Sequence, residues 1–359
     1  HGQVIPYLDG YSVNVHRVPY GVTAHIIPWN YPAQQFGRSV GPALAVGNAA
    51  VVKPSEDACL TTLVMSQLGL EAGLPPGALN IVAGLGDRAG AALSNHPEIN
   101  FMSFTGSPRV GTLVQQATAN HFVGCTLELG GKSPQVIFAD ADFEKAVPVI
   151  VKAIIQHAGQ TCSAGSRILV QKEIYNEFMT QVAAHFAKVR VGTPDMDLDC
   201  GPVMNAKQRN LVEGFRDEAI SSGIELLSEG VFAEGLDQSG FWVKPALFGN
   251  VPRDHRLACD EVFGPVLSAI PFEDELDAIK LANATDYGLV GSVWTKDGNR
   301  QQRVAKRMNC GQVFINNFGA GGGVELPFGG MKKSGHGREK GFVALEHFTT
   351  TKTIVHYHE

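Results

Sequence analysis

Hydrophobic and polar positions alternate with two different periods along the first third of the chain. Short apolar, β-branched runs predict buried strands at residues 21–27, 49–52, 79–82 and 100–104. Segments with apolar residues every three or four positions predict helices at residues 58–72, 87–95 and 108–119. Strands that alternate with helices in this order predict βαβ units, and therefore a parallel sheet.

The same alternation continues in the second half with longer elements. Helices are predicted at residues 143–157, 174–189, 206–222, 276–284 and 300–308. Strands are predicted at residues 167–170, 266–271, 289–294 and 312–316. Gly130 and Gly131 interrupt the pattern, so the sequence predicts two α/β domains with a boundary near residues 129–132.

Composition and charge narrow the function classes. The 359 residues are 44% apolar and 18% charged, which is typical of a globular protein and excludes a disordered one. With 29 basic and 35 acidic residues the net charge is −6, and no basic stripe indicates a nucleic-acid partner. The longest apolar stretch, residues 40–52, contains glycine and proline and is too short to cross a membrane.

Cysteine and histidine usage indicates neither a disulfide framework nor a metal site. The six cysteines form no CxxC pair, and no histidine cluster has the spacing of metal ligands. We therefore expect no metal and a reducing, cytoplasmic location.

Two segments at strand ends are candidates for nucleotide binding. The strand at 100–104 runs into Thr105, Gly106 and Ser107 at a helix start, where backbone N–H groups bind phosphate; a simple helix cap is the alternative. Lys53, Ser55 and Glu56 follow the strand at 49–52, at an edge where open parallel sheets bind ligands. Glu56 there suits the hydroxyls of a ribose, whereas a helix N-terminus capped by Ser55 is the alternative.

Cys162 is the candidate nucleophile. It lies in a turn of small residues, 159–165, between a predicted helix and a predicted strand, so its thiol is reachable. A nucleophilic cysteine also needs a nearby base or dipoles that favour the thiolate. A buried core cysteine is the alternative, and it fits poorly among Gly, Gln, Thr and Ser.

Seven segments together carry a family resemblance from about Val18 to the last residues. They are Pro28-Trp29-Asn30, Lys53-Pro54-Ser55-Glu56, Phe104-Thr105-Gly106-Ser107, Glu128-Leu129-Gly130-Gly131-Lys132-Ser133, Gly159-Gln160-Thr161-Cys162, Glu261-Val262-Phe263-Gly264-Pro265 and Pro327-Phe328-Gly329-Gly330. In this order and at this spacing the chain resembles the NAD(P)-dependent aldehyde dehydrogenase superfamily.

The resemblance implies an aldehyde dehydrogenase-like α/β fold. Its parts are a Rossmann-type parallel-sheet cofactor domain, an α/β catalytic domain and a small β oligomerisation element. On this chain they correspond to an oligomerisation arm at 1–19, an NAD-binding domain at 20–129, a catalytic domain at 130–334, and a return through the cofactor domain to an oligomerisation strand at 335–359. The expected assembly is a homodimer or homotetramer.

The resemblance also implies a reaction: oxidation of an aldehyde to a carboxylic acid. Cys162 is similar to the nucleophile that forms a thiohemiacetal and then a thioester. The Asn30 amide and the Cys162 backbone N–H would hold the oxyanion. Glu128 is similar to the base that activates water for hydrolysis.

Cofactor roles follow from the same resemblance. The implied cofactor-binding residues are Ile27, Pro28, Trp29, Lys53, Ser55, Glu56, Gly86, Thr105, Gly106, Ser107, Leu129, Gly130, Glu261 and Phe263. NAD is expected over NADP, because the Glu56 carboxylate would accept from both ribose hydroxyls and repel a 2′-phosphate.

The substrate funnel of the family corresponds to a third set of positions: Tyr31, His157, Thr161, Ser163 and Phe318. The adjoining loop 319–323 is almost entirely glycine and removes bulk. Together they indicate a medium-sized or aromatic aldehyde.

Two departures from the family pattern stand out. Many members carry a lysine nine residues after the oxyanion asparagine, as part of a proton relay; here Ser39 occupies that position, preceded by Arg38, although Glu339 matches the partner. Proton release is therefore expected along another path. Only 27 residues precede the Pro-Trp-Asn motif, where the family usually has roughly 130–140 more, about one typical domain.

The short start leads to a further expectation. Apolar surface of the cofactor domain should face water or a partner, which favours an oligomer or a poorly soluble chain with weak or no activity. The alternative function is therefore a non-catalytic or inactive nucleotide-binding fragment.

Overall fold

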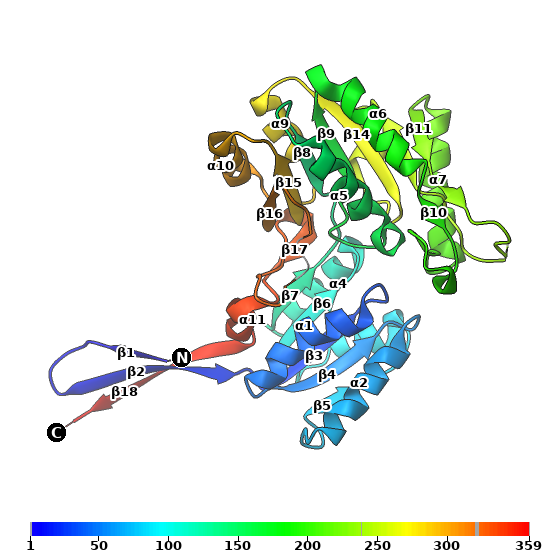
Figure 1. Ribbon diagram of the computed structural model, residues 1–359. Coiled ribbons are helices and arrows are strands. Elements are labelled where there is room, and N and C mark those ends of the chain that lie inside the picture. The colour runs from blue at the N-terminus through cyan, green and yellow to red at the C-terminus, as the bar shows by residue number, and fades with distance from the viewer. Residues whose placement is uncertain (1, 238, 320–322, 359) are drawn as a thin grey trace. The chain divides into compact units, whose positions relative to one another are not determined.

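The computed structural model describes residues 2–237, 239–319 and 323–358, which divide into two units (Figure 1). Unit 1 comprises His1–Leu129, Gly323–Gly329 and Gly335–Glu359. Unit 2 comprises Gly130–Gly322 and Gly330–Ser334. Each unit is built around its own sheet.

Unit 1 contains a six-stranded sheet in the order β17-β7-β6-β3-β4-β5. The strands are β3 (Val22–Ile27), β4 (Ala49–Pro54), β5 (Leu79–Ile81), β6 (Phe101–Thr105), β7 (Gly124–Glu128) and β17 (Gly335–His336). All neighbours are parallel except β17, which runs antiparallel to β7. The predicted parallel sheet is thus confirmed, with β7 and β17 as strands that the apolar pattern did not predict.

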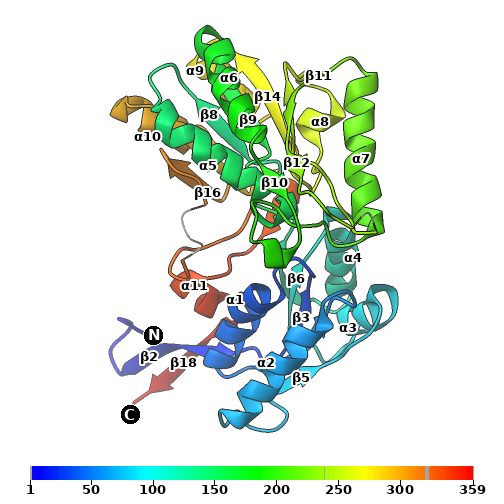
Figure 2. The same cartoon turned by 45° about the vertical axis from the view of Figure 1, so that its right-hand side comes forward.

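The α-helices that connect and flank these strands can be followed in Figure 2. They are α1 (Pro32–Ala45), α2 (Cys59–Glu71), α3 (Ala91–Ser94) and α4 (Pro108–Ala119). Helix α1 packs on β3 and β4 and against α2, whereas α3 and α4 lie together with α4 on β6 and β7. The predicted helix at 87–95 is in part wrong: a π-helical turn, η1 (Gly86–Gly90), precedes the single α-turn of α3.

Helix α2 carries large apolar side chains into solvent. Leu60, Val64 and Leu68 are each more than half exposed, and Thr62 is the buried residue of the helix. Unit 1 therefore exposes apolar surface at α2.

A three-stranded antiparallel sheet completes unit 1. Strands β1 (Gln3–Ile5) and β2 (Tyr11–Pro19) form a hairpin, and β18 (Thr349–Tyr357) follows α11 (Gly341–His347). Strand β18 pairs with β2 along its whole length, from Thr349 opposite Pro19 to Tyr357 opposite Tyr11. The two ends of the chain thus share one sheet.

Unit 2 contains a seven-stranded sheet in the order β11-β13-β14-β9-β8-β15-β16. The strands are β8 (Pro134–Ile137), β9 (Arg167–Gln171), β11 (Glu225–Glu229), β13 (Ala246–Gly249), β14 (Val266–Phe272), β15 (Val290–Trp294) and β16 (Gln312–Ile315). Only β11 runs antiparallel to its neighbour. A second, two-stranded sheet pairs β10 (Arg190–Val191) with β12 (Val231–Phe232).

The helices of unit 2 cover a continuous apolar core. They are α5 (Phe143–Ile155), α6 (Tyr175–Phe186), α7 (Ala206–Ser221), α8 (Arg256–Cys259), α9 (Glu275–Ala282) and α10 (Gly298–Arg307). Ile150 of α5, Phe178 and Phe186 of α6, and Phe248 and Phe272 of the sheet are completely or almost completely buried.

Several predicted helices of unit 2 end earlier than expected, and two of them adjoin irregular turns. The helix predicted at 143–157 stops at Ile155, because His157 and Ala158 adopt φ values of 53° in the following turn, η2 (Gln156–Gly159). The helix predicted at 174–189 ends at Phe186 and is preceded by a short 3-10 turn.

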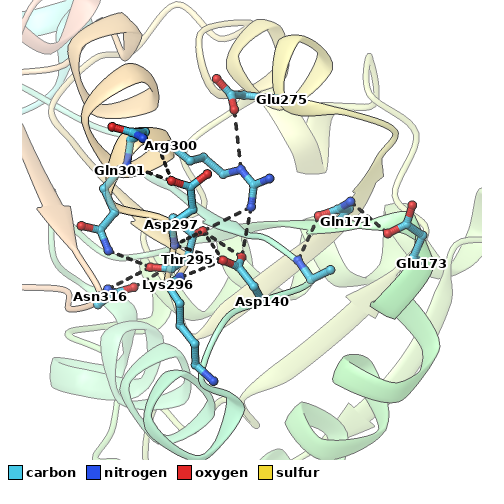
Figure 3. A network of polar contacts seen from close by, with 12 residues as sticks. Asp140, Gln171, Glu173, Glu275, Thr295, Lys296, Asp297, Arg300, Gln301 and Asn316 are labelled. Carbon is cyan, nitrogen blue, oxygen red and sulfur yellow. Dashed lines mark hydrogen bonds and ion pairs between the residues drawn. The ribbon is translucent and has the colours of Figure 1, made fainter.

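Asp140, just after β8, joins this strand to the segment between β15 and α10 (Figure 3). Its carboxylate accepts hydrogen bonds from the Thr295 hydroxyl at 2.8 Å and from the backbone N–H groups of Lys296 and Asp297 at 3.0 and 3.1 Å. Arg300 of α10 donates to the same carboxylate at 3.1 Å. Since a carboxylate has several acceptor sites, one side chain satisfies four donors.

Candidate active site

The Cys162 turn in unit 2 is fixed by close packing at Gly159 and by Gln160. A Cβ on Gly159 would lie 2.2 Å from the Gly264 backbone, and the residue has φ +70°, so only glycine fits. The buried Gln160 amide donates to the His157 carbonyl at 3.0 Å and accepts from the Met204 N–H at 2.7 Å. Cys162 itself is half-buried and lies in this closely packed turn.

Gly130 and Gly131 leave room for two groups of unit 2, the Glu261 carboxylate and the Cys162 carbonyl. The Glu261 carboxylate accepts from the Gly131 N–H at 2.9 Å, and a Cβ on Gly130 would lie 2.3 Å from that carboxylate. A Cβ on Gly131 would lie 2.4 Å from the Cys162 carbonyl. The glycine pair therefore lets Glu261 and the Cys162 turn approach the same stretch of backbone.

Glu261 and Lys132 are both ionisable near neutral pH. Burial raises the pKa of Glu261 to about 7 and lowers the pKa of Lys132 to about 7. The Gly131 N–H and the Lys132 charge oppose the shift of Glu261. The Lys132 Nζ has no hydrogen-bond partner among the described residues. Lys132 belongs to the motif at 128–133, but the sequence analysis gave it no role.

Glu128 ends β7 in unit 1 and is 2% exposed. Neither carboxylate oxygen has a hydrogen-bond partner among the described residues. Burial, and then the negative charge of Glu339, raise the pKa of Glu128 well above its usual range; Arg38 and Arg338 oppose them. A carboxyl with this environment can take up a proton at a higher pH than an exposed glutamate.

Gly329 gives Glu128 its space. A Cβ there would lie 2.7 Å from Glu128 Oε1 and 2.6 Å from the Gly337 carbonyl, and φ is +153°. The role of this glycine was missed from the sequence, although its motif, Pro327-Phe328-Gly329-Gly330, was recognised.

Lys53 and Glu56 form an ion pair at the carboxyl end of β4. The Lys53 Nζ lies 2.8 Å from Glu56 Oε2, and the side chains are 3% and 45% exposed. The hydrogen bond from Lys53, with a smaller contribution from the Gly86 backbone, lowers the pKa of Glu56, which keeps the carboxylate ionised. Ser55 accepts from the Asp57 N–H, and α2 begins only at Cys59, so Ser55 does not cap that helix.

Thr105, Gly106 and Ser107 lead from β6 into α4. Ser107 is the N-cap, accepting from the Val110 N–H at 3.4 Å, and the Gly106 N–H donates to the Glu128 carbonyl at 3.0 Å. The helix cap proposed as the alternative is therefore present. It does not exclude a ligand, because the remaining N–H groups of the first turn still point outward from the helix start.

The other predicted positions divide between the units. Ile27 ends β3, Asn30 follows it and is buried, Gly86 opens η1, and Leu129 follows β7, all in unit 1. Phe263, in unit 2, has φ +54° and its carbonyl accepts from Gln208 at 2.7 Å. Of the predicted funnel residues, Tyr31 is in unit 1 and His157, Thr161, Ser163 and Phe318 are in unit 2, while Ala320, Gly321 and Gly322 lie outside the described residues.

These residues fit a dinucleotide. The carboxyl end of β4 carries the ionised Glu56 beside Lys53, which suits the hydroxyls of a ribose. The carboxyl end of β6 leads into the N-terminus of the twelve-residue helix α4, which suits a pyrophosphate.

Of the described residues, no group of three or more His, Cys, Asp or Glu is arranged to hold a metal ion. The helices of the described segments also include none long and apolar enough to cross a membrane.

The sequence profile described as the aldehyde dehydrogenase family matches residues 1–354. The chain belongs to the aldehyde dehydrogenase family. It is 40% identical over 356 residues to retinal dehydrogenase 2 of Homo sapiens, covering 99% of this chain and 68% of that protein. This confirms the resemblance and the fold class.

Solved structures give the same answer. A Burkholderia cenocepacia protein assigned to the aldehyde dehydrogenases has a TM-score of 0.99 and 58% identity, covering 100% of this chain and 75% of that one. Betaine aldehyde dehydrogenase from Staphylococcus aureus in complex with NAD+ has a TM-score of 0.94 and 38% identity, covering 99% and 71%. This aldehyde dehydrogenase family member therefore has a relative whose structure contains NAD+.

Proposed function

We propose that the chain oxidises an aldehyde to a carboxylic acid with NAD+, using Cys162 as the covalent nucleophile. The observation that carries the proposal is the Cys162 turn: a half-buried thiol in a segment fixed by Gly159 and Gln160 within a family of aldehyde dehydrogenases. A positioned thiolate is the group that such a reaction needs first.

The proposed steps assign one task to each residue. The Cys162 sulfur attacks the aldehyde carbon, and the Asn30 amide with the Cys162 N–H stabilises the oxygen anion that forms. A bound NAD+ would supply the hydride acceptor for that carbon. Glu128 then takes a proton from water, which attacks the resulting thioester and releases the acid and the Cys162 thiol. The net reaction consumes one water and yields the acid, NADH and one proton.

The cofactor proposal assigns the predicted residues to parts of NAD+. Lys53 and Glu56 would hold the adenosine ribose, Gly106 and Ser107 the pyrophosphate, and Glu261 the nicotinamide ribose. The ion pair at Lys53 and the glycine space around Glu261 support these roles. The funnel residues favour a medium-sized or aromatic aldehyde.

We also propose a homodimer or homotetramer that assembles through the sheet of β1, β2 and β18. Its apolar side chains support this: Val4, Leu8 and Val355 are each more than half exposed. The cytoplasmic location stays a prediction. The same holds for the division into domains at residues 1–19, 20–129, 130–334 and 335–359.

The test is NADH formation by the full chain with a panel of aldehydes, with and without Cys162→Ala. We expect the variant to lose all but trace turnover while its NAD+ affinity stays near normal. Cys125→Ala, which removes a thiol from unit 1, is the matched control and should retain activity. Turnover in Cys162→Ala, or none in the native chain with any aldehyde, would contradict the proposal.

A further inference from the structure

Two histidines lie side by side at the end of β18 in unit 1. His356 belongs to the strand, and His358 directly follows its last residue, Tyr357. Because successive side chains of a strand alternate between its faces, the two imidazoles share one face of the β1-β2-β18 sheet. Both side chains are exposed, and their ring centres are 4.2 Å apart. The matched family profile ends at residue 354, so this pair lies outside it.

The backbone that carries the two histidines is held in place by its neighbours. Tyr357 lies opposite Tyr11 in the register of β18 and β2, and the His358 N–H donates to the Gly10 carbonyl at 2.6 Å. Gly10 has φ +80°, which favours glycine and lets the turn before β2 meet the end of β18. On the other face of the strand the rings of Tyr11 and Tyr357 are 4.9 Å apart. The pairing therefore extends as far as His358.

Ser12 orients the second ring. It lies directly opposite His356 in the register, so its side chain shares the face of the histidines. Its Oγ lies 2.9 Å from His358 Nε2. When Nε2 carries the proton and donates to this hydroxyl, Nδ1 keeps its lone pair for a ligand. A hydrogen bond at one ring nitrogen is the usual way in which a metal-ligating histidine is oriented.

The separation of the rings is close to that of two imidazoles on one metal ion. Each ligating nitrogen lies about 2.0–2.1 Å from a zinc ion, which places the centres of two neighbouring rings about 4.5–5 Å apart. The 4.2 Å between His356 and His358 is slightly shorter. Exposed side chains rotate readily, so the pair can open by this amount without repacking the core.

Imidazole nitrogen also selects the class of ion. It suits Ni²⁺, Cu²⁺ and Zn²⁺, whereas Mg²⁺ and Ca²⁺ prefer oxygen ligands. Among the described residues no third His, Cys, Asp or Glu joins the pair. The pair therefore offers two ligands to an ion, and water would fill the remaining coordination positions.

We propose that His356 and His358 chelate a divalent late transition-metal ion, of the class of Ni²⁺, Cu²⁺ and Zn²⁺, at the end of β18. Each imidazole supplies one nitrogen, and Ser12 holds the ring of His358. The metal site is independent of the proposed reaction, because it uses none of the residues assigned to that reaction.

The test is calorimetric titration of the full chain with Ni²⁺. His356→Asn and His358→Asn each leave a single imidazole, so we expect the affinity to fall about a hundredfold, since two linked ligands bind far more tightly than either alone. Ser12→Ala keeps both ligands and removes the orienting hydrogen bond, so we expect a fall of about tenfold. All six cysteines remain in each variant, so thiols contribute equally to every titration.

His16→Asn is the matched control. His16 is an exposed histidine of β2 in the same sheet, and its partner in β18 is Lys352. We expect its Ni²⁺ affinity to equal that of the native chain. An equal loss in His16→Asn, or an unchanged affinity in both His356→Asn and His358→Asn, would overturn the proposal. Two rings that only pack against each other predict a loosened strand end with no change in metal affinity.

A second measurement reads the site in the native chain by nitrogen-15 NMR of the histidine rings. Paramagnetic Ni²⁺ broadens the signals of nuclei close to it, so we expect the His356 and His358 signals to broaden first. The spectra of His356→Asn and His358→Asn assign these signals by their absence. Mg²⁺ at the same concentration should leave all ring signals sharp. Broadening that spares this pair, or the same response to Mg²⁺, would overturn the proposal.

Discussion

Glu128 is an ionisable residue whose surroundings disfavour its charge. Its pKa is raised by burial first and by Glu339 second. In the unfolded chain the same carboxyl titrates near its ordinary value of 4.5, so above that pH the unfolded state loses a proton that the folded state retains. The contribution of Glu128 to the free energy of unfolding is therefore fully present below its unfolded-state pKa. It is lost as the pH rises through the raised pKa of the folded state.

The resulting prediction concerns stability against pH. Glu128→Gln removes this loss, so we expect the variant to be more stable than the native chain at pH 8 and equal to it near pH 4.5. Each unit by which the pKa is raised corresponds to about 1.4 kcal/mol. Urea unfolding at several pH values measures the difference, and a constant difference across the range would contradict the assignment.

Glu56 carries a second prediction at this scale. Its carboxylate is kept ionised by Lys53, and a 2′-phosphate bound beside it would meet a like charge. Glu56→Gln should narrow the preference for NAD over NADP by about one decade, mainly by improving NADP binding. Affinities for both dinucleotides measure this, and Glu71→Gln, at the far end of α2, is the control that should leave the ratio unchanged.

At the scale of elements, one carboxylate ties a strand to a helix. Asp140, just after β8, accepts from Thr295, Lys296, Asp297 and Arg300 at the turn that starts α10. The Asp140 oxygens thus satisfy the Lys296 N–H and share the Asp297 N–H with Thr295 Oγ1, which lies 3.2 Å from it.

Asp140→Ala should therefore lower the free energy of unfolding by about 2 kcal/mol, because the donors at its oxygens lose their acceptor while partial exposure lets water replace some bonds. Denaturant unfolding measures the change. Asp195→Ala makes the same substitution at a fully exposed site in unit 2 and should change the stability little. Equal effects of the two substitutions would contradict this reading of the Asp140 contacts.

At the scale of the whole molecule, the two units differ in their cores. Unit 2 has one continuous buried cluster that includes residues of α5, α6, β9, β13 and β14. Unit 1 has three smaller clusters, and α2 exposes several of its leucines. Less buried apolar area gives unit 1 less protection against local opening.

Hydrogen–deuterium exchange should show this difference. We expect peptides from β3 and β4 to exchange about tenfold faster or more than peptides from β9 and β14, although all four are parallel strands flanked on both sides. Heating should widen the gap. Equal protection of the two sheets would show that the units unfold as one.

The sequence by itself determined most of the regular elements and the family. Strands such as β3, β6 and β14 are runs of apolar residues, and helices such as α4 and α7 have a local apolar period; both signals reside in consecutive residues. Strands β7, β8 and β13 were missed because four or five residues containing glycine, proline or polar groups carry no clear period.

The motifs likewise named the candidate residues, since each is a short local pattern. The roles given to Cys162, Asn30, Glu261 and the other site residues stay predictions. The polar residues Thr23, His25 and Ser103 inside buried strands were a signal in the sequence that was not used.

Only the tertiary structure decided the electrostatics of Glu128. Arg38 and Glu339 are far apart in the sequence, yet they form a buried ion pair, and Ser103 comes to Glu339 from the middle of another strand. The pKa of a buried group depends on the charges and donors around it in space, and on the water that packing excludes. No local pattern specifies those neighbours, because the folding of distant segments onto one sheet brings them together.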